Sequence, residues 1–265
     1  TNRVFGNAYA EFTPKMNWND RYNLVFREQA GVDIYTSNNA TIAEIGSAYN
    51  KKGEVENYGA QNNIFNNLLT ANFTAKWGAD KEWDFGFVLG NEFNHRYCRK
   101  WDYDGSGLAF YGQPTIGNTS SIDEHSEYHV QERTVGFFGQ MSLSWKDMVY
   151  LTVTGRNDKV SSMPRGHRSF FYPSVSLGWI FTELPALKDN QVLSYGKLRL
   201  SYAQVGQAGQ FYNNYMYVPV YGGGMYVYTP ISYPLGGAKG YTPYFVKFDE
   251  NLKPQNTSNW ETGID

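Results

Sequence analysis

The chain has 265 residues, and aromatic residues make up 17% of it, almost as much as the 18% that are charged. No stretch approaches the ~20 continuous apolar residues that a membrane-spanning helix needs, so an α-helical membrane protein is excluded. The formal net charge of −2 provides no attraction to nucleic acid, and the single cysteine, Cys98, excludes an internal disulfide.

Apolar and polar residues alternate along most of the chain, which is the period of a half-buried β-strand. In chain order, this pattern predicts strands at 4–13, 18–28, 69–77, 83–94, 134–145, 149–158, 172–181, 195–206 and 257–265. Val88 and Phe138 are apolar exceptions on the polar side of their strands. We therefore expect about nine antiparallel strands and an all-β fold.

The links between these strands alternate in length. Short links lie at 14–17, 78–81 and 146–147, and long ones at 29–64, 96–130, 157–170 and 207–256. The exception is 182–193, a longer link on the short side, whose first residues predict a brief helical turn. One end of the sheet thus has short turns and the other has long loops, which is typical of outer-membrane barrels with short periplasmic turns.

The two sides of the strands differ in the way that a transmembrane barrel requires. Trp77, Trp83 and Trp145 fall beside short turns, where an interfacial aromatic girdle would lie, and Phe85 and Phe137 follow on the same, lipid-facing side. Polar and charged residues alternate onto the other, lumen-facing side: Arg21, Asn23, Asn72, Asp84, Glu92, Arg156 and Arg199. A soluble β-sandwich, whose strands also alternate, is the alternative.

About nine strands is an odd number, whereas single-chain bacterial barrels close with even numbers of strands. An open sheet edge cannot lie in lipid, because each unpaired N–H and C=O costs several kcal/mol there. We therefore expect residues 1–265 to be part of one larger transmembrane barrel domain, without its closing strands.

Several segments, taken together and in their order along the chain, resemble the barrel strands of SusC/RagA-type TonB-dependent transporters. They are FGNAYAEFTP at 5–14, YLTVTGRND at 150–158, FYPSVSLGW at 171–179, GKLRLSYAQVG at 196–206, NLKP at 251–254 and WETGID at 260–265. The resemblance implies a barrel of about 22 strands with a plugged lumen. It also implies an N-terminal plug domain and a TonB-contacting region, neither of which is in this sequence, and a SusD/RagB-type surface lipoprotein as partner.

By this resemblance the protein imports oligosaccharides or oligopeptides across the outer membrane of a Bacteroidetes-type bacterium, driven by TonB. A passive porin or a surface adhesin barrel is the alternative that the strand pattern alone would allow. The substrate can be either a sugar or a peptide on this reasoning, because aromatic side chains stack on both.

Tyrosines crowd the long loop between 210 and 244. The candidates for contact with substrate or with the lipoprotein lid are Tyr212, Tyr215, Tyr217, Tyr221, Tyr226 and Tyr228. A tyrosine ring stacks on a ligand while its hydroxyl forms hydrogen bonds, and few rotatable bonds are immobilised. The alternative is that these tyrosines pack on one another.

Catalytic and metal motifs are weak. Asp102, Asp104 and Ser106 have the opening spacing of a calcium loop, but Gln113 stands where such a loop has a bidentate Glu. We therefore expect a polar outer turn and no metal site, with a bound cation as the alternative. No Gly-x-Ser-x-Gly elbow occurs. We expect neither an enzyme nor a cofactor, although outer-membrane proteases and lipases also use barrels.

Overall fold

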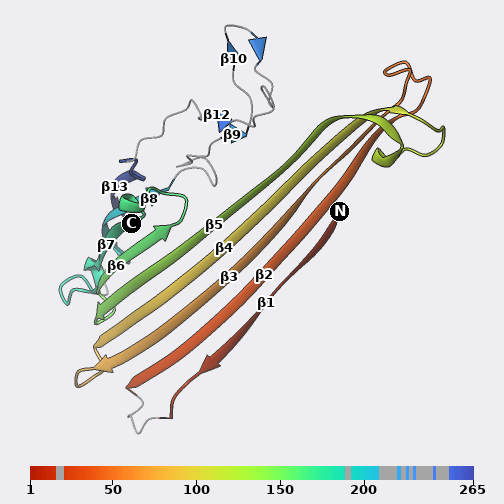
Figure 1. Ribbon diagram of the computed structural model, residues 1–265. Coiled ribbons are helices and arrows are strands. Elements are labelled where there is room, and N and C mark those ends of the chain that lie inside the picture. Colours follow the sequence, from red (N-terminus) through yellow and green to blue (C-terminus); the bar gives the residue numbers. More distant parts are fainter. Residues whose placement is uncertain are drawn as a thin grey trace.

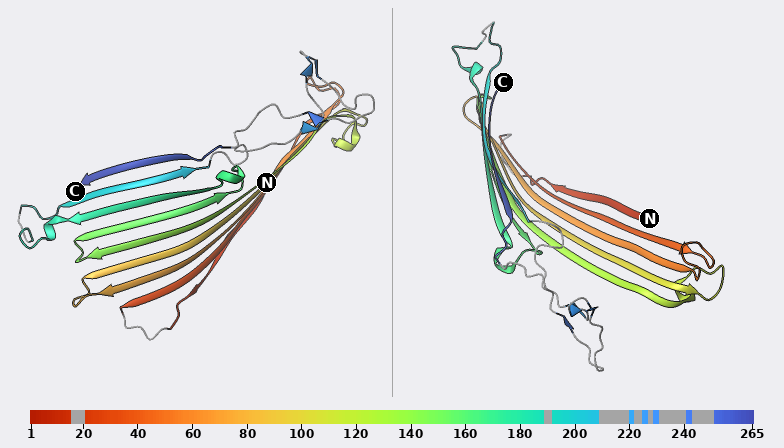
Figure 2. Two further views of the ribbon diagram at one scale, coloured as in Figure 1. Left: turned by 60° about the vertical axis from the view of Figure 1, so that its left-hand side comes forward. Right: turned by 90° about the horizontal axis from the view of Figure 1, so that it is seen from above.

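The chain forms one large antiparallel sheet. The computed structural model describes residues 1–15, 21–188, 192–208 and 251–265, together with four two-residue strands between 220 and 242. The main sheet has nine strands in the order β1-β2-β3-β4-β5-β6-β7-β8-β13, as the alternation predicts. Figure 2 shows the nine strands as a single curved layer that does not close on itself.

The strands of this sheet differ greatly in length. Their bounds are β1 Asn2–Phe12, β2 Tyr22–Ala43, β3 Glu54–Trp77, β4 Trp83–Leu108, β5 Thr119–Trp145, β6 Val149–Val160, β7 Ser169–Ile180, β8 Lys197–Gln207 and β13 Gln255–Ile264. The short pairs β9 Val220–Tyr221 with β12 Tyr241–Thr242, and β10 Met225–Tyr226 with β11 Thr229–Pro230, lie in the link between β8 and β13.

The predicted short turns after β3 and after β5 are present, and the second of them has positive φ angles. The link predicted at 14–17 lies between β1 and β2, and its residues 16 and 17 lie outside the described residues. Lys146 and Asp147, which connect β5 to β6, both have φ of 52°. The Met148 N–H donates to the Trp145 carbonyl over 2.9 Å, which closes the turn. Positive φ at both central residues is the mark of a type I′ turn, whose twist matches that of the flanking strands.

The long outer links are shorter than the sequence predicts. β2 continues to Ala43, and β3 already begins at Glu54. In the same way β4 continues to Leu108, and β5 begins at Thr119. In Figure 1, β2 to β5 accordingly extend far beyond the ends of β6 and β7. The prediction was wrong here because alternation marks only strands with one apolar face. Above the membrane both faces can be polar while the backbone pairing continues.

The calcium-loop hypothesis fails for the same reason. Asp102, Asp104 and Ser106 lie inside β4, paired in register with residues of β3, rather than in a loop that could wrap an ion. In a strand, these three residues point to the same side and are spread along it. Within the described residues, no three His, Cys, Asp or Glu side chains are grouped closely enough to hold a metal ion.

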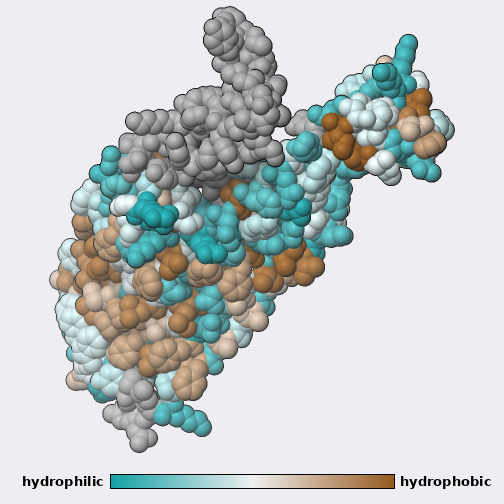
Figure 3. Space-filling model, in the orientation of Figure 1, coloured by the Kyte–Doolittle hydropathy of each residue, from teal (hydrophilic) through white to brown (hydrophobic). Residues whose placement is uncertain are grey.

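The faces of the sheet are defined by the strand register. Trp77 pairs with Trp83, and Trp83 with Trp145, so the three indoles form a row beside the short turns. Their ring centroids lie 6.1 and 5.9 Å apart along this row. We call the side that carries them the tryptophan face and the opposite side the polar face. Figure 3 shows hydrophobic residues gathered over the lower part of the sheet in that view and hydrophilic residues above.

Only a few side chains are fully buried. A small cluster of Val160, Met163 and Phe170 lies where β6 ends and β7 begins, next to the 3-10 turn Arg165–His167. The predicted helical turn after β7 is confirmed as a second 3-10 turn, Phe181–Glu183, and a third spans Ile116–Asn118. In the described part of the chain, no helix is long and apolar enough to cross a membrane.

Candidate functional site: the polar face of the sheet

The strand register brings the predicted lumen-facing residues to one side of the sheet. Glu92 pairs with Gly136, Gly136 with Asp158, and Phe138 with Arg156, so all of these lie on the polar face. The same parity places Arg21, Asn23, Asn72, Asp84 and Arg199 on that face. The polar face therefore carries charged and amide side chains on β2, β3, β4, β6 and β8, opposite the tryptophan face.

Arg156 is the centre of a charged network on this face. Its Nη2 donates to Glu92 Oε2 over 2.7 Å, and its Nε donates to Asp158 Oδ2 over 2.9 Å. The Tyr172 hydroxyl donates to the second of these carboxylates, and Asn94 Nδ2 donates to Glu92 Oε1 over 2.9 Å. One guanidinium thus joins β4 to β6 across the intervening strand β5, with every partner held by a charge-assisted hydrogen bond.

Glycines on β4 and on the intervening strand β5 make this crossing possible. A Cβ on Gly136 would lie 2.4 Å from Asp158 Oδ1 and 2.6 Å from Arg156 Nη2. Phe138, the apolar exception of the sequence, lies over Gly90, where a Cβ would be 2.1 Å from its ring. The Arg156 guanidinium in turn lies 5.7 Å from the centre of the Phe138 ring. The two glycines therefore leave space for the arginine and for the ring beneath it.

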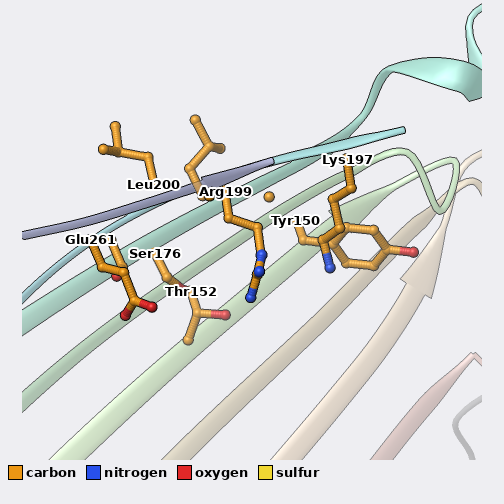
Figure 4. Close-up of a pocket in the computed structure, with 11 residues that line it drawn as sticks. Tyr150, Thr152, Ser176, Lys197, Arg199, Leu200 and Glu261 are labelled. Atoms are coloured by element: carbon orange, nitrogen blue, oxygen red, sulfur yellow. The ribbon is translucent and has the colours of Figure 1, made fainter. Parts of the chain in front are cut away.

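A pocket of about 280 Å³ opens on the polar face near the short turns (Figure 4). Its polar lining comes from four adjacent strands: Tyr150, Thr152, Ser176, Lys197, Arg199, Ser201 and Glu261. In Figure 4, Arg199 and Glu261 project to one side of their strands and Leu200 to the other. Arg199 Nη2 donates to Asp265 Oδ1 over 2.9 Å, and Lys197 Nζ lies 5.9 Å from the centre of the Tyr150 ring.

The remaining predicted lumen residues make local contacts. Asp84 forms an ion pair with Lys76 over 3.1 Å, and both side chains are half exposed. Arg21 Nη1 donates to the Gly78 carbonyl over 3.3 Å, at the short turn after β3. Asn23 pairs in register with Thr74 and makes no contact with Arg156. These residues share the face of the Arg156 network without joining it.

The tyrosine prediction concerns a part of the chain that is described only in pieces. Tyr221 lies in β9 and Tyr226 in β10, each in a two-residue hairpin strand. Tyr212, Tyr215, Tyr217 and Tyr228 lie outside the described residues. Their roles in contact with substrate or lid stay predictions.

The outer ends of β2 to β5, which extend beyond β6 and β7, are called the strand extensions. Acidic side chains gather on the polar face of these extensions. Glu56 pairs in register with Asp104, and Glu54 pairs with Ser106. Partial burial raises the pKa of Asp104, and the nearby charges of Glu54, Asp123, Glu56 and Asp102 raise it further. The opposite effect occurs on the other face of the extensions, where the hydrogen bond from Arg99 lowers the pKa of Glu127.

The raised pKa of Asp104 predicts that its ionised form weakens pairing of β3 with β4. This penalty is fully present above the raised pKa and disappears below the ordinary pKa of an aspartate. Asp104→Asn should therefore slow hydrogen exchange of the backbone amides at 54–58 and 102–106 severalfold at pH 7, after correction for the intrinsic exchange rate. At a pH where Asp104 of the wild-type protein is protonated, the wild-type and variant proteins should exchange alike. Asp80→Asn, in a short turn, is the matched control, and a D104N effect that does not vary with pH would contradict this assignment.

Sequence reasoning missed several members of the polar face. Asp158 and Tyr172 complete the Arg156 network, and Lys197 and Glu261 line the pocket. Their place in the alternation was the signal that could have found them. Tyr172, Lys197 and Glu261 each lie next to an apolar residue, and Asp158 lies two residues after Arg156. The pairing of Arg156 with Glu92, 64 residues away, had no signal in the sequence.

Comparisons with known proteins agree with this architecture. A family model described as "TonB dependent receptor-like, beta-barrel" matches residues 1–265. The TonB-dependent receptor SusC of Bacteroides thetaiotaomicron is 31% identical over 182 residues, which cover 69% of this chain and 17% of that protein. The TonB-dependent receptor P26 of Formosa agariphila is 33% identical over 70 residues, covering 26% of this chain and 7% of that protein.

Solved structures show the same fold. The RagAB peptide transporter matches with a TM-score of 0.74 at 17% identity, over 99% of this chain and 28% of the matched chain. The RagAB peptide importer in its "closed-closed" state matches equally well, with a TM-score of 0.74 at 19% identity. The present chain spans 17% of SusC, so it corresponds to a part of such a protein. It belongs to the TonB-dependent receptor-like β-barrel family, as a SusC/RagA-type chain of the bacterial outer membrane.

Proposed function

We propose that this sheet is part of a barrel of about 22 strands that imports oligosaccharides or oligopeptides in a TonB-dependent manner. In this proposal a plug domain fills the lumen, further strands close the barrel, and a SusD/RagB-type lipoprotein covers its outer mouth. Closure by further strands is supported by the edges of the sheet, β1 and β13, because unpaired backbone groups cannot face lipid.

The Arg156 network is the observation that carries this proposal. A guanidinium shared between Glu92 and Asp158, with side chains one-third exposed or less, suits a wall that faces a polar plug better than one that faces lipid. A wide passive pore would leave this wall in contact with bulk water, where ion pairs contribute little. The pocket around Arg199 offers further charged groups to the same plug domain.

Uptake in cells that carry the complete transporter tests the energy source. A proton uncoupler should abolish uptake of an oligosaccharide or oligopeptide substrate, because TonB transmits energy from the inner-membrane proton gradient. Deletion of the partner lipoprotein gene should reduce uptake at low substrate concentration. Uptake that survives the uncoupler would instead establish a passive porin. If deletion of the transporter gene itself reduces neither uptake nor cell adhesion, both assignments are refuted.

Binding and pull-down assays on the same complete transporter test the loop tyrosines. We propose that Tyr212, Tyr215, Tyr217, Tyr221, Tyr226 and Tyr228 contact substrate or the lipoprotein. Replacing Tyr226 and Tyr228 by alanine should weaken ligand binding or lipoprotein pull-down about tenfold, since aromatic anchors carry much of the affinity at such surfaces. Tyr49→Ala is the matched control, because Tyr49 is 83% exposed in a different outer turn. Unchanged affinity and unchanged pull-down would remove these tyrosines from the site.

A further inference from the structure

An apolar groove of about 520 Å³ crosses the tryptophan face of β2 to β7. Gly139 and Gly155 pair in register at its floor. Its apolar walls are Phe26, Leu69, Ala71, Leu89, Phe137 and Phe171. Phe137 is 57% exposed and Phe171 is 59% exposed, so both rings stand out from the sheet beside the glycines.

The floor of the groove is open because of its glycines. A Cβ on Gly139 would reach only ordinary contact, 3.4 Å from Leu89 Cδ2, so a side chain would fit there. A Cβ on Gly155 would lie 2.9 Å from the Phe171 ring, which leans over that position. A lipid-facing strand ordinarily fills such positions with apolar side chains, and here two adjacent strands leave them empty.

The strand geometry places this groove in the outer half of the membrane. At about 3.4 Å per residue and a tilt near 40°, Leu89 lies about 16 Å from the row of Trp77, Trp83 and Trp145. On the same scale Asn91 and Asn157, which line the rim of the groove, lie about 21 Å from that row, close to the limit of an apolar band about 25 Å tall. The upper end of the groove therefore meets the outer headgroup region.

Cationic side chains lie directly above this rim on the same face. Lys159 follows Asn157 by two residues, and Arg133 precedes Phe137 by four, so both remain on the tryptophan face. Lys159 pairs in register with Val135, which makes it a diagonal neighbour of Arg133, about 7–8 Å away across the sheet. Arg133 also pairs with His95. Both cations are exposed, and no described residue forms an ion pair with either.

Two acidic groups on this face of the strands already have partners. Glu28, which pairs in register with Leu69 of the groove wall, accepts a hydrogen bond from Asn67 Nδ2 over 3.0 Å. Glu127 accepts a hydrogen bond from Arg99 Nε over 2.7 Å and lies 2.9 Å from His129 Nε2. It therefore offers no charge to Arg133 or Lys159. The side chains on the tryptophan face just above the groove therefore carry a net positive charge. They lie at the depth of the lipid phosphates.

We propose that this groove and the two cations form a binding site for a membrane lipid of the outer leaflet with a phosphorylated headgroup. One acyl chain lies over Gly139 and Gly155 between the phenylalanine rings, and the phosphate contacts Arg133 and Lys159. The occupant is a lipid because the outer-membrane position surrounds the groove with acyl chains, and because apolar walls below cations match the two halves of such a molecule.

Lipid binding to the intact, detergent-purified transporter tests this site. Lipid A, the phosphorylated glycolipid of the outer leaflet, and its enzymatically dephosphorylated form serve as probes, with retained lipid counted by native mass spectrometry. Arg133→Ala and Lys159→Ala should each weaken binding of the phosphorylated form about fivefold and leave the dephosphorylated form unchanged. Gly139→Val fills the groove and should weaken binding of both forms.

Lys51→Ala, an exposed cation of an outer turn, is the matched control and should leave both affinities unchanged. Equal binding of phosphorylated lipid by the wild-type, Arg133→Ala and Lys159→Ala proteins would overturn the headgroup contact. If Gly139→Val binds both lipid forms as tightly as the wild-type protein does, the acyl-chain contact is overturned. A variant that fails to insert is recognised by loss of heat-modifiable migration on gels. Gly139→Ala, whose Cβ would reach only ordinary contact with Leu89, then tests the acyl-chain contact, and either cation variant tests the headgroup contact.

Discussion

Leu89→Arg should destabilise the barrel by about 2–4 kcal/mol, the cost measured for a cation on the lipid face at mid-bilayer. Leu89 is 52% exposed on the tryptophan face, about 16 Å above the tryptophan row, and its register partners there are Ala71 and Gly139. An arginine at this depth can extend toward either headgroup region only by passing across an apolar surface. Equilibrium unfolding of the intact protein in lipid vesicles, monitored by tryptophan fluorescence, measures this loss.

Val88→Arg is the matched control, because Val88 is the next residue in β4 and faces the opposite way. Its register partners Asn72 and Gln140 are polar, so a charge there remains in a polar lumen. The same substitution should therefore cost much less at Val88 than at Leu89. Equal losses at the two positions would mean that both faces are buried in protein, as in a soluble sandwich, and would contradict the assignment of the faces.

Arg156→Ala should destabilise the barrel by about 2–3 kcal/mol. The substitution leaves Glu92 and Asp158 with no shared cation, and the Asp158 side chain is only 12% exposed. Breaking a fully buried ion pair costs about 3–5 kcal/mol, and the one-third exposure of Arg156 and Glu92 lowers that expectation. Unfolding of the intact barrel, measured in the same vesicles, gives the free-energy change.

A second variant separates loss of charge balance from loss of packing. The triple change Arg156→Met, Glu92→Gln and Asp158→Asn removes all three charges while keeping the volumes similar, so it should recover much of the stability lost in Arg156→Ala. Arg199→Ala, which removes an ion pair with side chains 55% and 43% exposed, should cost less than about 1 kcal/mol. If Arg156→Ala unfolds like the wild type, the network does not hold β4 to β6.

The alternation of residue types was sufficient to locate the strands that cross the membrane. From β4 to β6 the predicted segments agree closely with the structure at their short-turn ends, because Trp83, Trp145 and Val149 begin or end an apolar series there. The method failed where β2 to β5 leave the membrane, since a strand with water on both sides has no apolar face. For the same reason Asp102 lies in a strand and not in the outer turn that the sequence predicts.

The sequence by itself determined which residues share a face, because side chains alternate along every strand with a period of two. It thereby placed Arg156, Glu92 and Arg199 together on one side and the tryptophans on the other. Only the tertiary structure decided which of them meet, because contact across strands depends on the register between segments far apart in the chain. That register joins Arg156 to Glu92, sets Gly139 beside Gly155 and brings Lys159 close to Arg133.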